Sequence, residues 1–235
     1  MNYAIIAAGE GSRLIREGLS TPKPLIALNG VPLIDRLLDI FCRNEAEAIH
    51  IIINETQLSV REHVESTVRR VPIHWIVQST PSSLHSFYEL SRFLQGEKFC
   101  LTTVDTVFQP HAFTSFIRAF DKDTENDGLL AVTDYIDDEK PLYVSVDEST
   151  GLIRDFHDEP NGNDKYISGG IYGLTPQTIP VLDRCKEQNI ARMRNYQRQL
   201  IAGGFKLKAH LFDKIMDIDH KKDIQIAEKW LADET

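Results

Sequence analysis

Short apolar runs alternate with longer amphipathic segments over the first half of the chain. Asn2–Ala7 and Ala48–Ile53 are apolar almost throughout, which is typical of strands buried on both faces of a sheet. Leucines and a phenylalanine recur at helical spacing in 31–43. The same alternation predicts helices at 57–69 and 83–94 and strands at 73–78 and 98–104. Such a pattern predicts right-handed βαβ units and a mainly parallel sheet with helices on both faces.

The pattern changes after Phe120. Strand-like runs follow without long helices between them, namely DGLLAVT, LYVSVD, LIRDF and YISGGIYGL. This part favours an antiparallel or mixed extension of the sheet. Two helices are expected at 176–187 and 192–202, then a strand at 206–212 and a closing helix over Lys221–Ala232. We therefore predict an α/β fold, a Rossmann-like three-layer α/β/α arrangement with a mixed, mainly parallel central sheet, as one domain over residues 1–235.

The composition narrows the class of protein. The chain has 235 residues, of which 42% are hydrophobic and 26% charged, which suits one soluble α/β domain. There are 26 basic and 35 acidic residues, and the resulting net charge of −9 argues against a nucleic-acid binder. An anionic ligand would therefore need cations placed locally.

Targeting and redox signals are weak. The three cysteines are far apart and form no CxxC pair, so reduced thiols are expected. The N-terminus begins with a strand-like run and not with a signal peptide, and no apolar run approaches the ~20 residues of a membrane helix. We expect a cytoplasmic protein that does not enter a membrane, as a monomer or homodimer.

A glycine-rich loop follows the first strand. Gly9 and Gly11 allow positive φ and close approach of a ligand to the backbone, whose N–H groups can cradle phosphate oxygens. The phosphate-binding P-loop needs a lysine directly after its last glycine, and Arg13 comes after Ser12 here. The dinucleotide fingerprint needs a glycine where Leu14 stands. The glycines alone fit a tight strand-to-loop turn equally well.

Two cations near this loop favour the phosphate interpretation. Arg13 offers a planar fork that suits phosphate oxygens. Lys23 lies between Pro22 and Pro24, and a residue before proline is biased towards an extended conformation. The prolines are therefore expected to hold the lysine in an extended segment. Together the two cations could neutralise part of a triphosphate.

The run GEGSRL followed by PKPL, after a buried N-terminal strand, resembles the signature of the nucleotidyltransferases that join an NTP to a sugar phosphate or a similar phosphomonoester. These are the nucleoside-diphosphate-sugar pyrophosphorylases. The resemblance implies a Rossmann-like sheet and Mg²⁺-dependent attack of a phosphate oxygen on the α-phosphorus, with pyrophosphate leaving. It also implies an NTP-binding half, residues 1–120, and an acceptor-binding half, residues 121–235, that carries the second metal ligand.

Site residues follow from this resemblance. Arg13 and Lys23 are expected to be catalytic, with Arg13 holding the leaving phosphates and Lys23 stabilising charge around the α-phosphate. The loop residues expected to bind the NTP are Ala7, Ala8, Gly9, Gly11 and Ser12. The segment after the third strand reads the nucleobase in this family, so Gln78 and Ser83 are expected there, with serines at 82 and 83 where the family usually has a glycine.

Aspartates are candidates for a metal site. Asp105 ends a predicted strand, where ligands of parallel sheets bind, although a turn or helix N-cap is an alternative role. Asp217 and Asp219 lie on the same side of an extended segment, and Asp219 is a plausible N-cap of the last helix. We therefore assign Asp217 to the metal and Asp219 to capping. The resemblance likewise implies that Asp105 and Asp217 bind Mg²⁺.

The acceptor segment departs from the family pattern. FHDEPNGNDKYISGGIYGL resembles the family's EKP followed by an Asn-Ala-Gly-Ile-Tyr-like strand, but Glu159 stands where the lysine is expected. Lys165 could substitute for that lysine, or it could be a solvated loop residue. Gly169 and Gly170 match the glycine position of the family, and Gly170 is assigned to acceptor binding together with Lys165.

The expected reaction is Mg²⁺-dependent nucleotidyl transfer from an NTP to a sugar 1-phosphate. One alternative is a cytidylyltransferase for a non-sugar acceptor, such as a phosphocholine-like compound or a phosphonate. A second is a non-catalytic relative that senses nucleotide. A glycosyltransferase would need a DxD motif at the end of the fourth strand, where Thr103 replaces the first aspartate.

Overall fold

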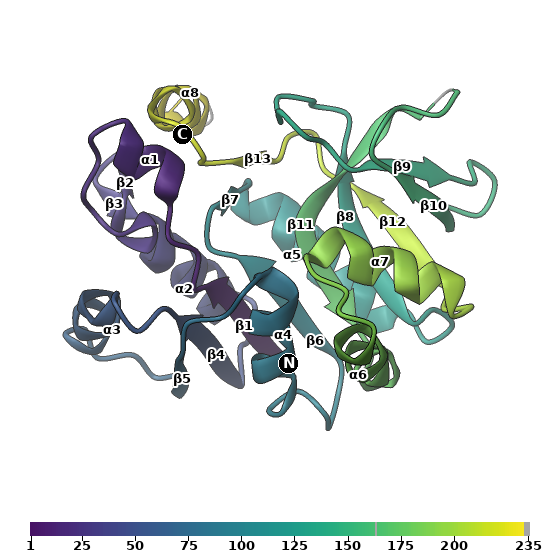
Figure 1. The fold of residues 1–235 in the computed structure, drawn as a ribbon, viewed down its shortest axis with the longest axis horizontal. Coiled ribbons are helices and arrows are strands. Elements are labelled where there is room, and N and C mark those ends of the chain that lie inside the picture. The colour runs from purple at the N-terminus through teal and green to yellow at the C-terminus, as the bar shows by residue number, and fades with distance from the viewer. Residues whose placement is uncertain (163, 233–235) are drawn as a thin grey trace.

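Nine strands form a central sheet in the computed structural model, which describes residues 1–162 and 164–232 (Figure 1). The strands of the first half lie in the order β6–β1–β4–β5 and run parallel to one another. They are β1 (Asn2–Ala7), β4 (Ala48–Ile53), β5 (Ile73–Val77) and β6 (Phe99–Thr103). The parallel sheet expected for this half is confirmed.

The second half extends the same sheet in mixed orientation. Strand β11 (Tyr166–Leu174) pairs antiparallel with β6, β8 and β9, so it joins the two halves. The other strands here are β8 (Gly128–Thr133), β9 (Tyr143–Val146), β10 (Ile153–His157) and β12 (Leu207–Leu211). This arrangement confirms the mixed extension. Two small two-stranded sheets join β2 (Ala27–Leu28) to β3 (Val31–Pro32) and β7 (Thr106–Val107) to β13 (Met216–Asp217).

Helices cover both faces of the sheet. The core on one face includes residues of α2 (Leu33–Arg43), α3 (Leu58–Glu65) and α5 (Pro110–Lys122). The core on the other face includes residues of α4 (Ser83–Ser91), α6 (Pro180–Glu187) and α7 (Met193–Ala202). The short helix α1 (Ser12–Arg16) and the last helix α8 (Lys221–Ala232) contribute to a third cluster, and η1 (Lys23–Leu25) and η2 (Pro176–Thr178) are single 3₁₀ turns. Among the helices of the described residues, none has the length and apolar character needed to cross a membrane.

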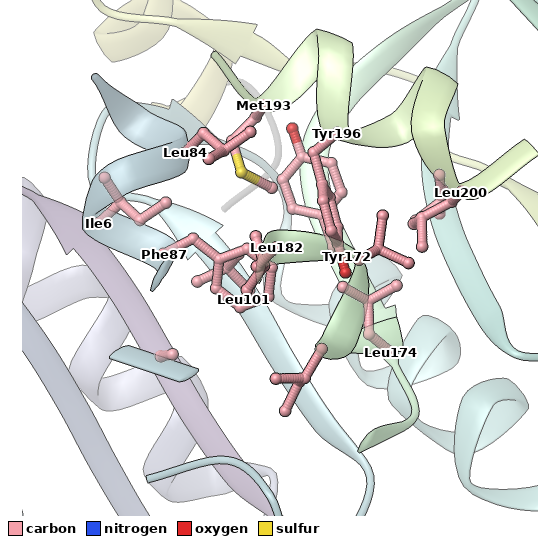
Figure 2. Close-up of a cluster of buried hydrophobic side chains, with 14 of the residues drawn as sticks. Ile6, Leu84, Phe87, Leu101, Tyr172, Leu174, Leu182, Met193, Tyr196 and Leu200 are labelled. Carbon is pink, nitrogen blue, oxygen red and sulfur yellow. The ribbon is translucent and has the colours of Figure 1, made fainter. Parts of the chain in front are cut away.

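Alternation along β1 shows why the strands are apolar throughout. Ala4 and Ile6 belong to one core, whereas Tyr3 and Ile5 belong to the other, because successive side chains point to opposite faces. Figure 2 shows the first of these cores, where Ile6 of the first half lies near helices of both halves. Both halves of the chain therefore contribute side chains to this core.

The structure differs from the sequence-based prediction in several helices. Helix α5 was not predicted, although Pro110 at its first turn and phenylalanines at 113, 116 and 120 are signals for it. Helix α3 ends at Glu65, four residues before its predicted end at 69, because no apolar stripe continues beyond it and Val68 is 98% exposed. Helix α4 likewise ends at Ser91.

A buried histidine makes stability depend on pH. His50 on β4 is 5% exposed, and its ring stacks with those of both His74 and Phe93. Burial, and then the nearby His74, lower its pKa to about 4. The unfolded chain therefore binds more protons than the folded chain between about pH 6.5 and pH 4, so the free energy of unfolding falls as the pH is lowered through this window.

We expect this residue to make the protein about 2 kcal/mol less stable at pH 5 than at pH 7.5. Replacing His50 with phenylalanine keeps the ring stack and should remove this part of the difference. Urea unfolding at the two pH values measures it, with His111→Asn, an exposed histidine of α5, as the control. The same pH difference in wild type and His50→Phe would contradict the assignment.

Candidate active site

The candidate site is a cleft of about 890 Å³ at the carboxyl ends of the parallel strands. Its walls come from the loop after β1, the segments after β4, β5 and β6, and Asp219 just before α8. The predicted site residues that line it are Ala8, Gly9, Gly11, Ser12, Arg13, Lys23, Ser83 and Asp105. Figure 1 shows β1 and β6 ending towards β7 and β13, where these segments meet.

The glycine-rich loop has a positive φ at Gly11 but not at Gly9. Gly11 has φ 64°, in the left-handed region, and precedes α1 directly. A Cβ at Gly11 would lie 3.4 Å from Cβ of Lys23, so the loop packs closely against the lysine. The buried Gln57 side chain donates to the carbonyl of Gly9 at 3.2 Å and thereby holds the loop in place. Ala7, which was also predicted to bind the NTP, does not line the cleft, because its side chain packs in the core on the other face of the sheet.

Lys23 is almost buried and bound on two sides. Its Nζ lies 2.5 Å from Oδ2 of Asp105 and 2.8 Å from Oδ1 of Asp219, and only 9% of its side chain is exposed. Burial alone would lower the pKa of Lys23, but the two carboxylates raise it above its ordinary value. The ammonium group is therefore a fixed cation at the end of β6.

The prediction of an extended Lys23 was wrong. The residue begins the 3₁₀ turn η1, closed by hydrogen bonds from Leu25 N–H to the carbonyl of Pro22 and from Ile26 N–H to the carbonyl of Lys23. Pro22 itself is extended, with ψ 135°. The 3₁₀ turn forms although residues before proline, such as Lys23, prefer an extended conformation. Proline is tolerated in the first turn of a helix, because the N–H that it lacks would have no partner there.

The capping role predicted for Asp219 was also wrong. Its Oδ2 lies 2.5 Å from Nη1 of Arg13, and its other oxygen accepts from Lys23. The N–H groups of Asp219 and His220 donate instead to Asp223, at 2.9 and 2.7 Å. Asp219 thus belongs to the cleft, where it binds both cations of the signature.

Asp105 and Asp217 meet through the small sheet of β7 and β13. Thr106, directly after Asp105, pairs with Asp217 and donates to its Oδ1 at 3.0 Å. The N–H of Ile218 donates to the carbonyl of Asp105 at 3.1 Å. The sequence positions 105 and 217 are far apart, and the antiparallel pairing brings both carboxyl groups to one place.

The electrostatics of the two carboxyl groups differ. Burial raises the pKa of Asp105, but the Lys23 ammonium reverses this and holds the pKa below its usual value. For Asp217, desolvation of the carboxyl group and then the negative charge of Asp105 raise the pKa to about 8, although the residue as a whole is exposed. A cation between the two groups would offset their repulsion.

This donor set fits Mg²⁺. Both ligands are carboxylate oxygens, and protein sites for Mg²⁺ supply one or two carboxylates, with substrate phosphates and water as the remaining ligands. No group of three or more His, Cys, Asp or Glu side chains able to hold a metal occurs within residues 1–162 and 164–232.

The nucleobase side of the cleft differs in part from the prediction. Ser83 lines the cleft, and its Oγ accepts from the N–H of Met193 at the start of α7. Gln78 does not line the cleft; its side chain is exposed and its N–H pairs with Ile53. The hydroxyls of Thr80 and Ser86 line this wall and were missed, although both follow the third strand, as the base-binding segment should.

On the acceptor side, neither Gly170 nor Lys165 is among the described residues that line the cleft or the recess beside it, but Gly170 lies close to Thr106. Gly170 has φ 71°, and a Cβ there would lie 2.8 Å from Oγ1 of Thr106, the residue that pairs with Asp217. Lys165 points to the surface, with 63% of its side chain exposed, and lies 3.3 Å from Glu148. The acceptor role predicted for Lys165 therefore has no support in the geometry.

A small recess of about 50 Å³ adjoins Asp217 and Asp219. It is lined on the far side by β11, at Ile167, Ser168 and Gly169, and by the acidic segment Asp137, Asp138 and Glu139. Glu139 lies 3.3 Å from His220, which also contacts Glu17 at 2.6 Å. The recess is therefore strongly acidic on the sides formed by Asp217, Asp219 and residues 137–139.

Known proteins resemble this chain over most of its length. The bifunctional protein GlmU of Coxiella burnetii is 28% identical over 162 residues, 68% of this chain, and the match spans only 31% of that relative. The UTP–glucose-1-phosphate uridylyltransferase AglF of Haloferax volcanii is 23% identical and covers 100% of this chain and 98% of its own. The CMP-5'-(3-aminopropyl)phosphonate synthase of Streptomyces rubellomurinus is 26% identical over 58% of this chain and 24% of its own.

A solved structure shares the fold. The inositol-1-phosphate CTP transferase of T. maritima superposes with a TM-score of 0.80 at 20% identity, over 97% of this chain and 95% of that protein. The family described as Nucleotidyl transferase matches residues 3–216, which include the glycine-rich loop, Lys23 and Asp105. This chain belongs to the Nucleotidyl transferase family.

Proposed function

We propose that this protein transfers the nucleotidyl group of an NTP to a phosphomonoester, a sugar 1-phosphate in the first instance, and releases pyrophosphate. The observation that carries the proposal is the convergence of Arg13, Lys23 and Asp105 in one cleft beside a glycine-rich loop, with Asp217 lining the adjoining recess. The name of AglF, a relative of the same length, supports a hexose 1-phosphate as acceptor.

The chemistry is an in-line displacement. An oxygen of the acceptor phosphate forms a bond to the α-phosphorus of the NTP, and the bond from that phosphorus to the oxygen bridging to the β-phosphate breaks. The electron pair leaves with pyrophosphate. Because the attacking oxygen is already anionic, the protein needs no general base and acts by positioning and charge stabilisation.

Each side chain has a role in this displacement. Arg13, half exposed at the mouth of the cleft, binds the β- and γ-phosphates that leave. Lys23, fixed between two carboxylates, stabilises charge on the α-phosphate. Asp105 and Asp217 would hold Mg²⁺, whose charge draws the phosphate groups together when it is bound. The wall formed by Thr80, Ser83 and Ser86 faces the nucleobase.

A second candidate acceptor carries an ammonium group. Asp137, Asp138 and Glu139 line the recess beside Asp217, and one relative is named for an aminopropyl phosphonate. Carboxylates there would favour a cationic tail on a phosphonate or phosphocholine-like acceptor, with CTP as donor. The alternative to an enzyme is a non-catalytic relative that binds nucleotide without turnover.

The cytoplasmic location and the oligomeric state, monomer or homodimer, stay predictions.

A matrix of four NTPs against a set of phosphomonoesters tests the proposal. Pyrophosphate release should require Mg²⁺ and both substrates, and should be fastest with one base and one acceptor. Glucose 1-phosphate, inositol 1-phosphate, phosphocholine and 3-aminopropylphosphonate separate the two candidate acceptor classes. Nucleotide binding without pyrophosphate release from any pair would favour the sensor and refute the proposed reaction.

A further inference from the structure

Asp219 has a position that the proposed reaction does not use. Its two carboxylate oxygens bind the two cations of the signature separately, Oδ1 to Lys23 at 2.8 Å and Oδ2 to Arg13 at 2.5 Å. About a third of its side chain is exposed, as is that of Arg13, so both groups lie at the surface of the cleft. Asp219 therefore bridges the buried and the exposed cation.

The formal charges of this cluster cancel. Arg13 and Lys23 contribute two positive charges, and Asp105 and Asp219 contribute two negative ones. Such neutrality is favourable while the cleft holds only water, because a buried cation without a partner is costly. It is unfavourable for a triphosphate, which must approach the same two cations against the negative charge of Asp219.

The backbone around Asp219 is fixed, whereas its side chain is not constrained by capping. The N–H of Asp219 donates to Asp223 and that of Ile218 donates to the Asp105 carbonyl. The Asp219 carboxylate could therefore leave the two cations by rotation about its side-chain bonds alone, with β13 and α8 in place. Lys23 keeps its second partner, Asp105, throughout.

We propose that Asp219 is a positioning residue that holds Arg13 and Lys23 in the empty cleft and is exchanged for the phosphates of the incoming nucleotide. The inference rests on the proposed function, because the ligand is the triphosphate of the donor. Asp219 competes with that triphosphate for the same N–H donors, so it sets the affinity of the cleft for polyphosphate. It also keeps the two cations in place for the phosphates that replace it.

Binding of inorganic pyrophosphate in EDTA, measured by isothermal titration calorimetry, tests the exchange without turnover. Asp219→Asn, which removes the charge and keeps the shape, should bind pyrophosphate about tenfold more tightly than wild type, the effect expected from one unit charge at contact distance in a partly exposed site. Asp219→Glu, which keeps the charge, should stay within about threefold of wild type.

Glu10→Gln is the matched control, because Glu10 lies on the glycine-rich loop of the same cleft and forms no ion pair with either cation in the described part of the chain. It should leave pyrophosphate affinity within about threefold. Unchanged or weaker binding by Asp219→Asn would overturn the proposal, as would equal tightening by Glu10→Gln, which would indicate a general field effect.

Two further checks keep the outcome unambiguous. Thermal unfolding verifies that Asp219→Asn is folded, and Asp219→Ala replaces it if it is not, with the same expected tightening. If wild type binds pyrophosphate and the variants behave as expected but no NTP and acceptor pair reacts, the exchange stands and the proposed reaction fails. If the reaction occurs and the variants bind pyrophosphate no more tightly, only the exchange fails.

Discussion

Replacing Lys23 with alanine is expected to lower kcat by roughly 10²–10³-fold, by analogy with the removal of one preorganised group that stabilises transition-state charge. The Lys23 side chain is 9% exposed and its ammonium group is held by two carboxylates, so it needs no reorganisation when charge develops on the α-phosphate. The KM for the NTP should change less than kcat, because Arg13 still binds the leaving phosphates. Steady-state pyrophosphate release measures both constants.

Lys165→Ala is the control for this variant. It removes the same charge from an exposed position near Glu148 and should leave kcat within about twofold. Lys23→Arg keeps the charge but changes its shape and should recover only part of the rate. Wild-type kcat in a folded Lys23→Ala protein would contradict the catalytic role and leave the lysine with a structural one, as the partner of Asp105 and Asp219.

Asparagine at position 105 or 217 is expected to reduce turnover by about 10³-fold or more, since a catalytic metal ion supplies several kcal/mol of charge stabilisation. Each substitution keeps the size of the side chain and removes one anionic oxygen ligand. The two carboxyl groups are brought together by the pairing of Asp217 with Thr106, so neither can replace the other.

Metal binding provides a readout other than activity. Mn²⁺ binding in the presence of a non-hydrolysable NTP, followed by electron paramagnetic resonance, should weaken by at least about tenfold in Asp105→Asn and in Asp217→Asn. Asp213→Asn, an exposed aspartate nearby in sequence, should bind Mn²⁺ as wild type does. Normal Mn²⁺ affinity in both variants would show that these aspartates are not the metal ligands.

The sheet and the nucleotide loop could be predicted from the sequence because their signals are local. An apolar run such as Ala48–Ile53 can only be a buried strand here, and Gly11 takes the left-handed φ that a glycine before Ser12 allows. Helix α5 was not predicted, although Pro110 in its first turn and the spacing of its phenylalanines are local signals as well.

The missed and misplaced site residues depend on contacts between distant segments. Asp219 has the sequence context of an N-cap, and only the approach of Arg13 and Lys23, about two hundred positions away, gives it another role. The exposed side chains of Lys165 and Gln78 likewise follow from where their segments turn away from the cleft. Such tertiary effects leave no periodic signal in the sequence.

³¹P nuclear magnetic resonance of the wild-type protein with Mg²⁺, the preferred NTP and the preferred phosphomonoester tests nucleotidyl transfer most directly. The NTP and acceptor signals are expected to decline together while pyrophosphate and a new diphosphate-linked product appear in equal amounts. Release of inorganic phosphate with NDP, or no change in any signal across the full set of substrates, would contradict nucleotidyl transfer at this cleft.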